Sequence, residues 1–248
     1  MRQFGSGGFG SIPLVVKNLL IINIIMLLAT WVVRNTFGID LNRVLGLFFF
    51  RSESFMPIQI VTHMFMHGGL THLFFNMFAL WMFGRVLESV WGPKRFFIYY
   101  MVTGLGAVFL HTLVNYIGLK SAMNQLTPDQ VNLVFERGTE YLQNRQVFTD
   151  PAMEKLQLIL NTPTVGASGA VFGVLLGFGM LFPNTQLMLL FPPIPIKAKY
   201  FVIAYGALEL YLGISQPGSN VAHFAHLGGM IFGFILIKYW DKTTHDFY

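Results

Sequence analysis

The sequence contains no cysteine, and charged residues make up only 11% of its 248 residues. The absence of cysteine excludes disulfide bonds, thiolate catalysis and cysteine-based metal sites. A soluble domain usually carries about a quarter of charged residues, so this low charge, beside 54% hydrophobic residues, indicates a membrane protein with several spans. The sequence also lacks a run of basic residues, which argues against nucleic acid as a partner.

Six apolar stretches come close to the roughly 20 residues that a transmembrane helix needs. They cover residues 14–33, 70–90, 96–119, 165–182, 199–214 and 221–240. An even number of spans places both termini on one side of the membrane, and the distribution of Lys and Arg near the span ends favours the cytoplasm for that side. We therefore predict an all-α membrane domain over residues 14–240, with residues 1–13 as a disordered lead-in and 241–248 as a tail.

Two outer loops are long enough to carry structure of their own. The loop before the second span covers about residues 34–69, and its apolar runs at 47–50 and 58–61 are expected to lie in the membrane interface. Residues 117–163 form a soluble insertion in which Thr127-Pro128 and Asp150-Pro151 each predict the start of a helix. The resulting helical hairpin either covers the functional site or acts as a spacer, and the sequence leaves both open.

The segment Gly166-Ala167-Ser168-Gly169 opens the fourth span. Gly169, Gly173 and Gly177 share one helical face, and a similar glycine face lies at 228–233, so the fourth and sixth helices are expected to pack closely. That packing would bring Ser168 near His226, which is the arrangement of a nucleophile and its general base.

Each of these residues also has an ordinary interpretation. A serine in such a helix is more often a small packing residue that bonds its own backbone. A lone membrane histidine is often bonded to a carbonyl of a neighbouring helix. His223, three residues before His226 on about the same face, is an alternative base.

His72 and Asn76 stand four residues apart at the start of the second span, so they share a helical face. Both side chains can donate hydrogen bonds, and two donors aimed at one point would stabilise the negative oxygen of a tetrahedral intermediate. The alternative is a hydrogen bond that only holds the second span to its neighbour. Because spans two, four and six all begin on the outer side, His72, Ser168 and His226 are expected at a similar depth.

A metal site is the main chemical alternative, because five histidines form a loose set: His63, His67, His72, His223 and His226. Neither histidine cluster contains Asp or Glu, and the sequence has no HExxH helix. We therefore predict no metal, and we expect the first two histidines to fix the loop before the second span.

Two glutamates fall close to or within the spans. Glu209 is the one acidic residue at membrane depth, which makes it a functional candidate, but the sequence supplies no partner for it. Glu88 is expected to make an ordinary loop contact with Arg85 or Arg95 near the inner surface.

Three segments together resemble the rhomboid family of intramembrane serine proteases. They are residues 63–76 (HMFMHGGLTHLFFN), 166–169 (GASG) and 223–229 (HFAHLGG). The resemblance covers nearly the whole chain, and the order of the three segments makes it specific. It implies a bundle of six transmembrane helices around a water-filled cavity that opens to the outside.

The resemblance also implies roles for single residues. Ser168 corresponds to the nucleophile and His226 to the general base of a dyad without a carboxylate. His72, Asn76 and the backbone N–H of Ser168 correspond to the oxyanion hole. The supporting positions are Gly166, Phe172 and His223, of which Phe172 takes the place of an aromatic ring against the base.

The expected function is an intramembrane serine endopeptidase that cleaves single-span membrane proteins near the outer membrane face, with no cofactor. The expected partners are transmembrane-helix substrates and the lipid bilayer, and the oligomeric state is left open. The alternative is a catalytically inactive rhomboid-like protein that binds membrane proteins, although such relatives lack the serine or the histidine. A bacterial plasma membrane fits the size and layout, and an organellar membrane is the other possibility.

Overall fold

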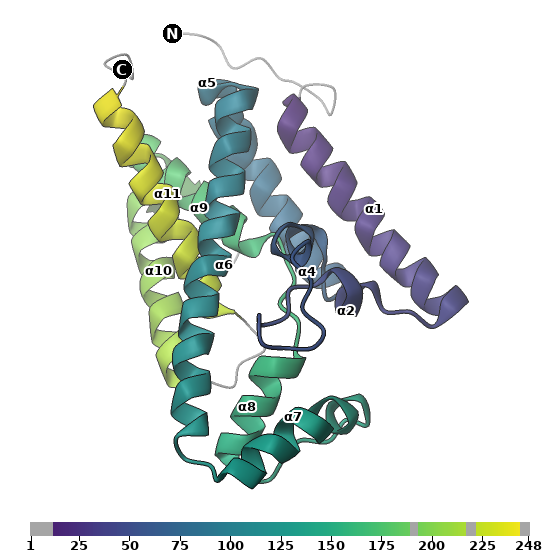
Figure 1. Ribbon diagram of the computed structural model, residues 1–248. Coiled ribbons are helices and arrows are strands. Elements are labelled where there is room, and N and C mark those ends of the chain that lie inside the picture. The colour runs from purple at the N-terminus through teal and green to yellow at the C-terminus, as the bar shows by residue number, and fades with distance from the viewer. Residues whose placement is uncertain (1–11, 189–192, 217–221, 244–248) are drawn as a thin grey trace, which may run out of the picture.

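The computed structural model describes residues 12–188, 193–216 and 222–243, and most of these residues are helical (Figure 1). The long helices are α1 (Leu14–Phe37), α6 (Pro93–Met123), α9 (Ser168–Leu181), α10 (Ala198–Ser215) and α11 (His223–Thr243). A continuous helix over residues 70–91 consists of α4 (Leu70–Ala79), the π-helical turn η3 (Leu80–Gly84) and α5 (Arg85–Trp91). Shorter helices fill the connections: α2 (Leu41–Leu45), α3 (Gln59–Thr62), η2 (His63–Phe65), α7 (Pro128–Gln143) and α8 (Pro151–Asn161).

Each of the six predicted spans coincides with a helical segment. Among the described residues, three helices are long and apolar enough to cross a membrane, namely α1, the helix over 70–91 and α6, while α9 is apolar but shorter. The chain is therefore a mostly helical, multi-pass membrane protein. In Figure 1, α1 begins and α11 ends at the same end of the bundle, as the even number of spans predicts. Residues 1–11 and 244–248, which hold most of the predicted lead-in and tail, lie outside the described residues.

A small β-sheet departs from the all-α prediction. Strand β1 (Gln186–Met188) pairs antiparallel with β2 (Pro195–Lys197) between α9 and α10, with Leu187 opposite Ile196. Strands of three residues are too short to show an alternation of apolar and polar residues. The sequence therefore gave no signal for them.

Helices α6, α9 and α11 form the most closely packed part of the bundle. A Cβ atom on Gly229 of α11 would collide with the backbone carbonyl of Gly169 in α9, so only glycine permits this approach. On the neighbouring face, a Cβ atom on Gly228 would lie 2.9 Å from the Cα atom of Ala107 in α6. The predicted close contact between the fourth and sixth spans is confirmed at Gly169 and Gly229.

The remainder of the predicted glycine contact is wrong. A Cβ atom on Gly173 would collide with Thr103 of α6, and one on Gly177 would lie 3.1 Å from Leu87 Cδ1 and from the Tyr99 hydroxyl. Residues four apart advance by about 40° around a helix of 3.6 residues per turn. The glycine stripe of α9 therefore winds away from α11, and its later glycines face α6 and α5.

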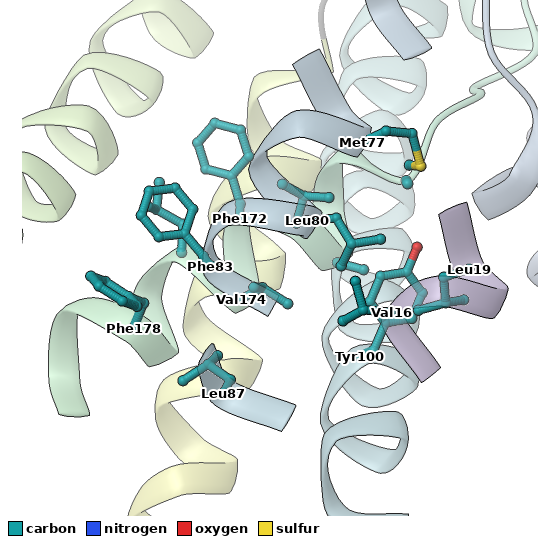
Figure 2. Packing of buried hydrophobic residues seen from close by; sticks show 14 of the residues in the cluster. Val16, Leu19, Met77, Leu80, Phe83, Leu87, Tyr100, Phe172, Val174 and Phe178 are labelled. Carbon is teal, nitrogen blue, oxygen red and sulfur yellow. The ribbon is translucent and has the colours of Figure 1, made fainter. Parts of the chain in front are cut away.

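The main apolar core lies between α1, the helix over 70–91, α6 and α9. Figure 2 shows Val16 and Leu19 of α1 beside Tyr100 of α6, with Leu80 nearby. Phe83 and Phe178 join the helix over 70–91 to α9, with ring centroids 4.9 Å apart. This core fixes the position of α9, whose first residue is Ser168.

Glu88 of α5 holds the N-terminus of α1, instead of making the ordinary loop contact expected from the sequence. Its two carboxylate oxygens accept the backbone N–H groups of Val15 and Val16 at 2.9 and 2.8 Å. The residue before α1 is Pro13, which offers no side-chain cap. Because the first N–H groups of a helix lack partners within the helix, the buried Glu88 carboxylate satisfies two of them and adds a favourable charge.

The loop before α4 is built around the buried side chain of Gln59. Its Oε1 atom accepts from the backbone N–H groups of Phe48 and Met56, and its Nε2 atom donates to the carbonyls of Val44 and Ser54. The expectation that residues 47–50 lie in the membrane interface is wrong for residues 47–49, which are buried. Ile58, Ile60 and Val61 are exposed, as an interfacial position requires.

The insertion forms the predicted hairpin of two helices, α7 and α8. Thr127 caps α7 through a reciprocal pair with Gln130, and the Asp150 carboxylate caps α8 by accepting from the N–H groups of Ala152 and Met153. The hairpin packs against the end of α6 through a separate apolar cluster that includes Leu119, Val134 and Leu156 together with Phe49 of the preceding loop. Figure 1 shows it beyond the end of the helices that carry the glycine contact.

Candidate active site

Ser168 and His226 meet at the ends of two different helices. Ser168 is the first residue of α9, and His226 lies in the first turn of α11. The Oγ atom of Ser168 is 2.9 Å from Nε2 of His226, which is hydrogen-bond distance. The contact between Gly169 and Gly229 lies one residue after the serine and three after the histidine, so the glycine packing brings these two side chains together.

The other ring nitrogen of His226 contacts Glu209 of α10. The Nδ1 atom of His226 lies 2.9 Å from Glu209 Oε2, and Nδ1 of His223 lies 2.6 Å from the same oxygen. All three side chains are buried. The sequence singled out Glu209 but supplied no partner for it, because this pairing joins two helices whose relative rotation the sequence does not reveal.

These three residues are also the group of potential metal ligands that lies closest together in the described part of the chain. The three ligand atoms of Glu209, His223 and His226 are all within 4.8 Å of one another. The distances of 2.6 and 2.9 Å are those of direct N–H···O hydrogen bonds. The acidic residue that the sequence lacked beside these histidines is therefore supplied by Glu209 from another helix, and the expectation of no metal stays a prediction.

The ring of Phe172, one turn after Ser168, stacks on the imidazole of His226. The two ring centroids are 4.1 Å apart and the ring planes differ by 5°. Tyr205 of α10 packs on Phe172 in turn, with centroids 4.9 Å apart. Held by the stack on one face and by the Glu209 contact at its edge, the His226 ring has a fixed orientation.

His72 of α4 approaches the same region, and Asn76 lies one turn further along the same helix. A Cβ atom on Gly166 would lie 2.9 Å from Nε2 of His72 and 3.6 Å from Oγ of Ser168, so these two polar atoms face the same side of Gly166. Gly166 has φ of +131°, a backbone conformation that other residues rarely adopt. The Nδ2 atom of Asn76 is buried and has no hydrogen-bond partner among the described residues. It is a donor available for a ligand.

The chain segment before Ser168 is held on two sides. Leu47 and Thr164 exchange backbone hydrogen bonds of 2.9 and 2.8 Å, and the N–H of Gly166 donates to the carbonyl of His63 at 2.9 Å. The hydroxyl of Thr164 also lies 3.0 Å from Nε2 of His111 in α6. His111 lies in a long apolar helix and belongs to no motif, so the sequence carries no signal for this contact.

His63 and His67 belong to the loop before α4, as expected, and neither belongs to the group around Glu209. The Nδ1 atom of His63 donates to the carbonyl of Gln59 at 2.9 Å. Burial lowers the pKa of His63 to about 4, and burial together with the nearby His72 lowers the pKa of His67 to about 4. Both rings are therefore neutral in the folded protein at pH 7.

Replacing His67 with leucine is expected to reduce the sensitivity of folding to acid. In the unfolded chain a histidine binds a proton below about pH 6.5, but the folded protein admits it at His67 only near pH 4. Stability is therefore lost as the pH falls from 6.5 towards 4, by up to about 3 kcal/mol for this residue. Leucine has a similar volume and does not titrate.

The comparison is between thermal unfolding at pH 7 and at pH 5 for wild type and His67→Leu. The substitution removes no hydrogen bond of good geometry to a described residue, because neither ring nitrogen of His67 makes one. The variant should lose less stability between the two pH values than wild type does. An equal loss in both proteins would show that His67 does not contribute to the acid sensitivity.

Comparison with protein families and curated proteins shows which family the chain resembles. Residues 54–240 match the family model described as Rhomboid domain. The chain is 28% identical over 188 residues to "Rhomboid protein 1, mitochondrial" of Saccharomyces cerevisiae, covering 75% of this chain and 43% of the relative. It is 26% identical over 176 residues to "Rhomboid protease GluP" of Bacillus subtilis, covering 71% of this chain and 24% of the relative.

The matched chain is shorter than these relatives, of which it spans less than half. The relatives include mitochondrial as well as bacterial proteins, so they do not favour one compartment for this chain. The predicted bacterial plasma membrane stays a prediction.

Proposed function

Because the chain belongs to the rhomboid family, we propose that it is an intramembrane serine endopeptidase with Ser168 as the nucleophile and His226 as the general base. The single observation that carries this proposal is the 2.9 Å contact between Ser168 Oγ and His226 Nε2. A hydroxyl becomes a useful nucleophile when an adjacent base accepts its proton. Both side chains that such a reaction needs are present in this chain.

The reaction begins when Oγ of Ser168 attacks the carbonyl carbon of a substrate peptide bond and its proton passes to Nε2 of His226. The carbonyl electrons move onto the oxygen, which becomes negative. When the C–N bond breaks, His226 returns the proton to the leaving amine, and a water molecule then hydrolyses the acyl-enzyme by the same route.

Three donors are suited to stabilise the negative oxygen. They are the His72 ring, the Asn76 amide and the backbone N–H of Ser168, which lies at the start of α9 where N–H groups have no partner within the helix. The buried and unpartnered Nδ2 atom of Asn76 supports this assignment. Gly166 is the residue that leaves room for the His72 ring beside the serine.

The proposed substrates are single-span membrane proteins, cut near the outer end of their helix. In this arrangement six helical segments cross the bilayer with both termini in the cytoplasm: α1, the helix over 70–91, α6, α9, α10 and α11. Exposed apolar side chains along α10 and α11, such as Ile203, Ile214 and Phe234, are consistent with lipid contact. A substrate helix must unwind locally, because its peptide bonds are shielded by their own hydrogen bonds.

Incubation of the purified protein with a single-span membrane substrate in liposomes tests the proposed function. Wild type should release two fragments, and Ser168→Ala should release none, because no other group supplies the attacking oxygen. Since no metal takes part in the proposed mechanism, a chelator should leave cleavage unchanged. Binding of the substrate by wild type without any cleavage would favour the inactive, rhomboid-like binder instead.

A further inference from the structure

Glu209 is the one acidic residue of α10, and the residue is only 4% exposed. A carboxylate at membrane depth is costly unless it is paired. The proposed serine–histidine chemistry does not by itself require a buried acid. The position of the Glu209 carboxylate therefore needs a separate explanation.

The contacts of Glu209 place it in line with the two reacting groups. Its Oε2 atom contacts Nδ1 of His226 at 2.9 Å, and Nε2 of the same ring contacts Ser168 at 2.9 Å on the opposite side. A carboxylate, an imidazole and a hydroxyl in this order form the arrangement of a catalytic triad. Three separate helices, α10, α11 and α9, contribute one group each.

We propose that Glu209 is a positioning residue that converts the serine–histidine pair of this chain into a Ser168–His226–Glu209 triad. This inference rests on the proposed function. A carboxylate only accepts hydrogen bonds, so the proton of neutral His226 resides on Nδ1. Its Nε2 atom is then left with a lone pair that can accept the proton of Ser168. When His226 takes that proton, the negative charge of Glu209 stabilises the resulting imidazolium.

His223 gives the carboxylate a second donor. Its Nδ1–H bonds the same Oε2 atom at 2.6 Å from one turn earlier on α11. Two donors from one helix hold the Glu209 oxygen in place, and the stack of Phe172 holds the ring that it orients. His223 is therefore assigned to the carboxylate, and His226, which alone of the two contacts Ser168 in the described structure, is assigned to the serine.

The charged and titratable groups near His226 come from four helices. Besides Glu209 and Tyr205 of α10 and His223 of α11, they include His72 of α4 and His111 of α6, both of which interact electrostatically with His226. The carboxylate of Glu209 is the negative group among them. Its removal should therefore have a larger effect on His226 than changes at the other rings.

Glu209→Gln separates a catalytic role from a purely structural one. The amide oxygen of glutamine can accept the same N–H bonds, but it carries no charge. We expect kcat to fall by about 10²-fold or more while KM changes less than about threefold. The pH at which kcat/KM reaches half of its maximum should move lower, because the imidazolium loses its negative neighbour.

Glu88→Gln is the matched control, because Glu88 is also a buried carboxylate that accepts two N–H groups, but it caps α1. This variant should lower thermal stability without moving the pH profile. If Glu209→Gln behaves in the same way, with unchanged kcat and an unchanged profile, Glu209 only joins α10 to α11 and the triad is wrong.

A second measurement does not depend on proteolysis or on a folded variant. Nitrogen NMR of the wild-type protein with labelled histidine reports which ring nitrogen of His226 carries the proton. We expect Nδ1–H, and a proton on Nε2 of neutral His226 would overturn the triad. If wild type cleaves no substrate but shows Nδ1–H, the proposed function fails while the pairing of Glu209 with His226 stands.

Discussion

Ser168→Ala is expected to abolish proteolysis, and His226→Asn is expected to lower kcat/KM by about 10³-fold or more. Alanine removes the attacking oxygen. Asparagine can still form a hydrogen bond, but it cannot take a proton from a hydroxyl near neutral pH. Because the 2.9 Å contact makes the two side chains act as one unit, losing either should cost nearly the whole effect.

A double-mutant cycle measures this coupling directly. Measured on the slow residual hydrolysis that oxyanion stabilisation and binding still support, the variant that carries both substitutions should be no less active than Ser168→Ala alone, because activity that depends on the pair can be lost only once. Ser89→Ala is the matched control, since Ser89 is exposed in α5 and its hydroxyl donates to the carbonyl of Arg85 in its own helix. It should retain wild-type activity. Additive losses in the cycle would mean that Ser168 and His226 act independently.

Gly229→Val is the second change with a large expected effect. Any Cβ atom at this position collides with the backbone of Gly169, and backbone atoms can yield only if α9 and α11 move apart. A displacement of about 1 Å at a reacting pair typically costs about 10²-fold in rate. We therefore expect at least that loss of kcat/KM, together with a destabilisation of about 1–3 kcal/mol from overpacking.

Gly206→Ala provides a matched glycine substitution in α10. There the added Cβ atom would lie 3.1 Å from the terminal methyl group of Met230, a flexible side chain that can adjust. Activity and thermal stability should stay close to wild type. If Gly229→Val is as active as Gly206→Ala, the close approach of α9 and α11 does not position the reacting pair.

Much of the helical layout could be predicted from the sequence, because apolar length and glycine spacing are local signals. The spans, the caps at Thr127 and Asp150 and the contact between Gly169 and Gly229 are examples. The contacts of Gly173 and Gly177 could not be predicted from the sequence, because they depend on how α6 is placed beside α9. Burial of residues 47–49 depends in the same way on Gln59, whose four hydrogen bonds all lie within a loop that has no periodic pattern.

The site shows the same division. The motifs pointed to Ser168, His226, His72 and Asn76, and the first three of these residues approach one region of the structure. Glu209 drew attention because of its charge, but nothing in the sequence gives the rotation of α10 relative to α11. An acidic residue in one span and two histidines one turn apart in the next were the available signal. The expectation that a buried carboxylate in one span pairs with a histidine in the neighbouring span would have connected Glu209 with His223 and His226.

The account depends on an activated hydroxyl at Ser168, and labelling with a fluorophosphonate probe tests this most directly. The reagent forms a bond with a serine oxygen only when a neighbouring base activates it. After labelling of the wild-type protein, peptide mapping should locate the adduct on Ser168, and His226→Asn should slow its formation strongly. An adduct on another serine, or labelling of Ser168 that is equally fast without His226, would contradict the account.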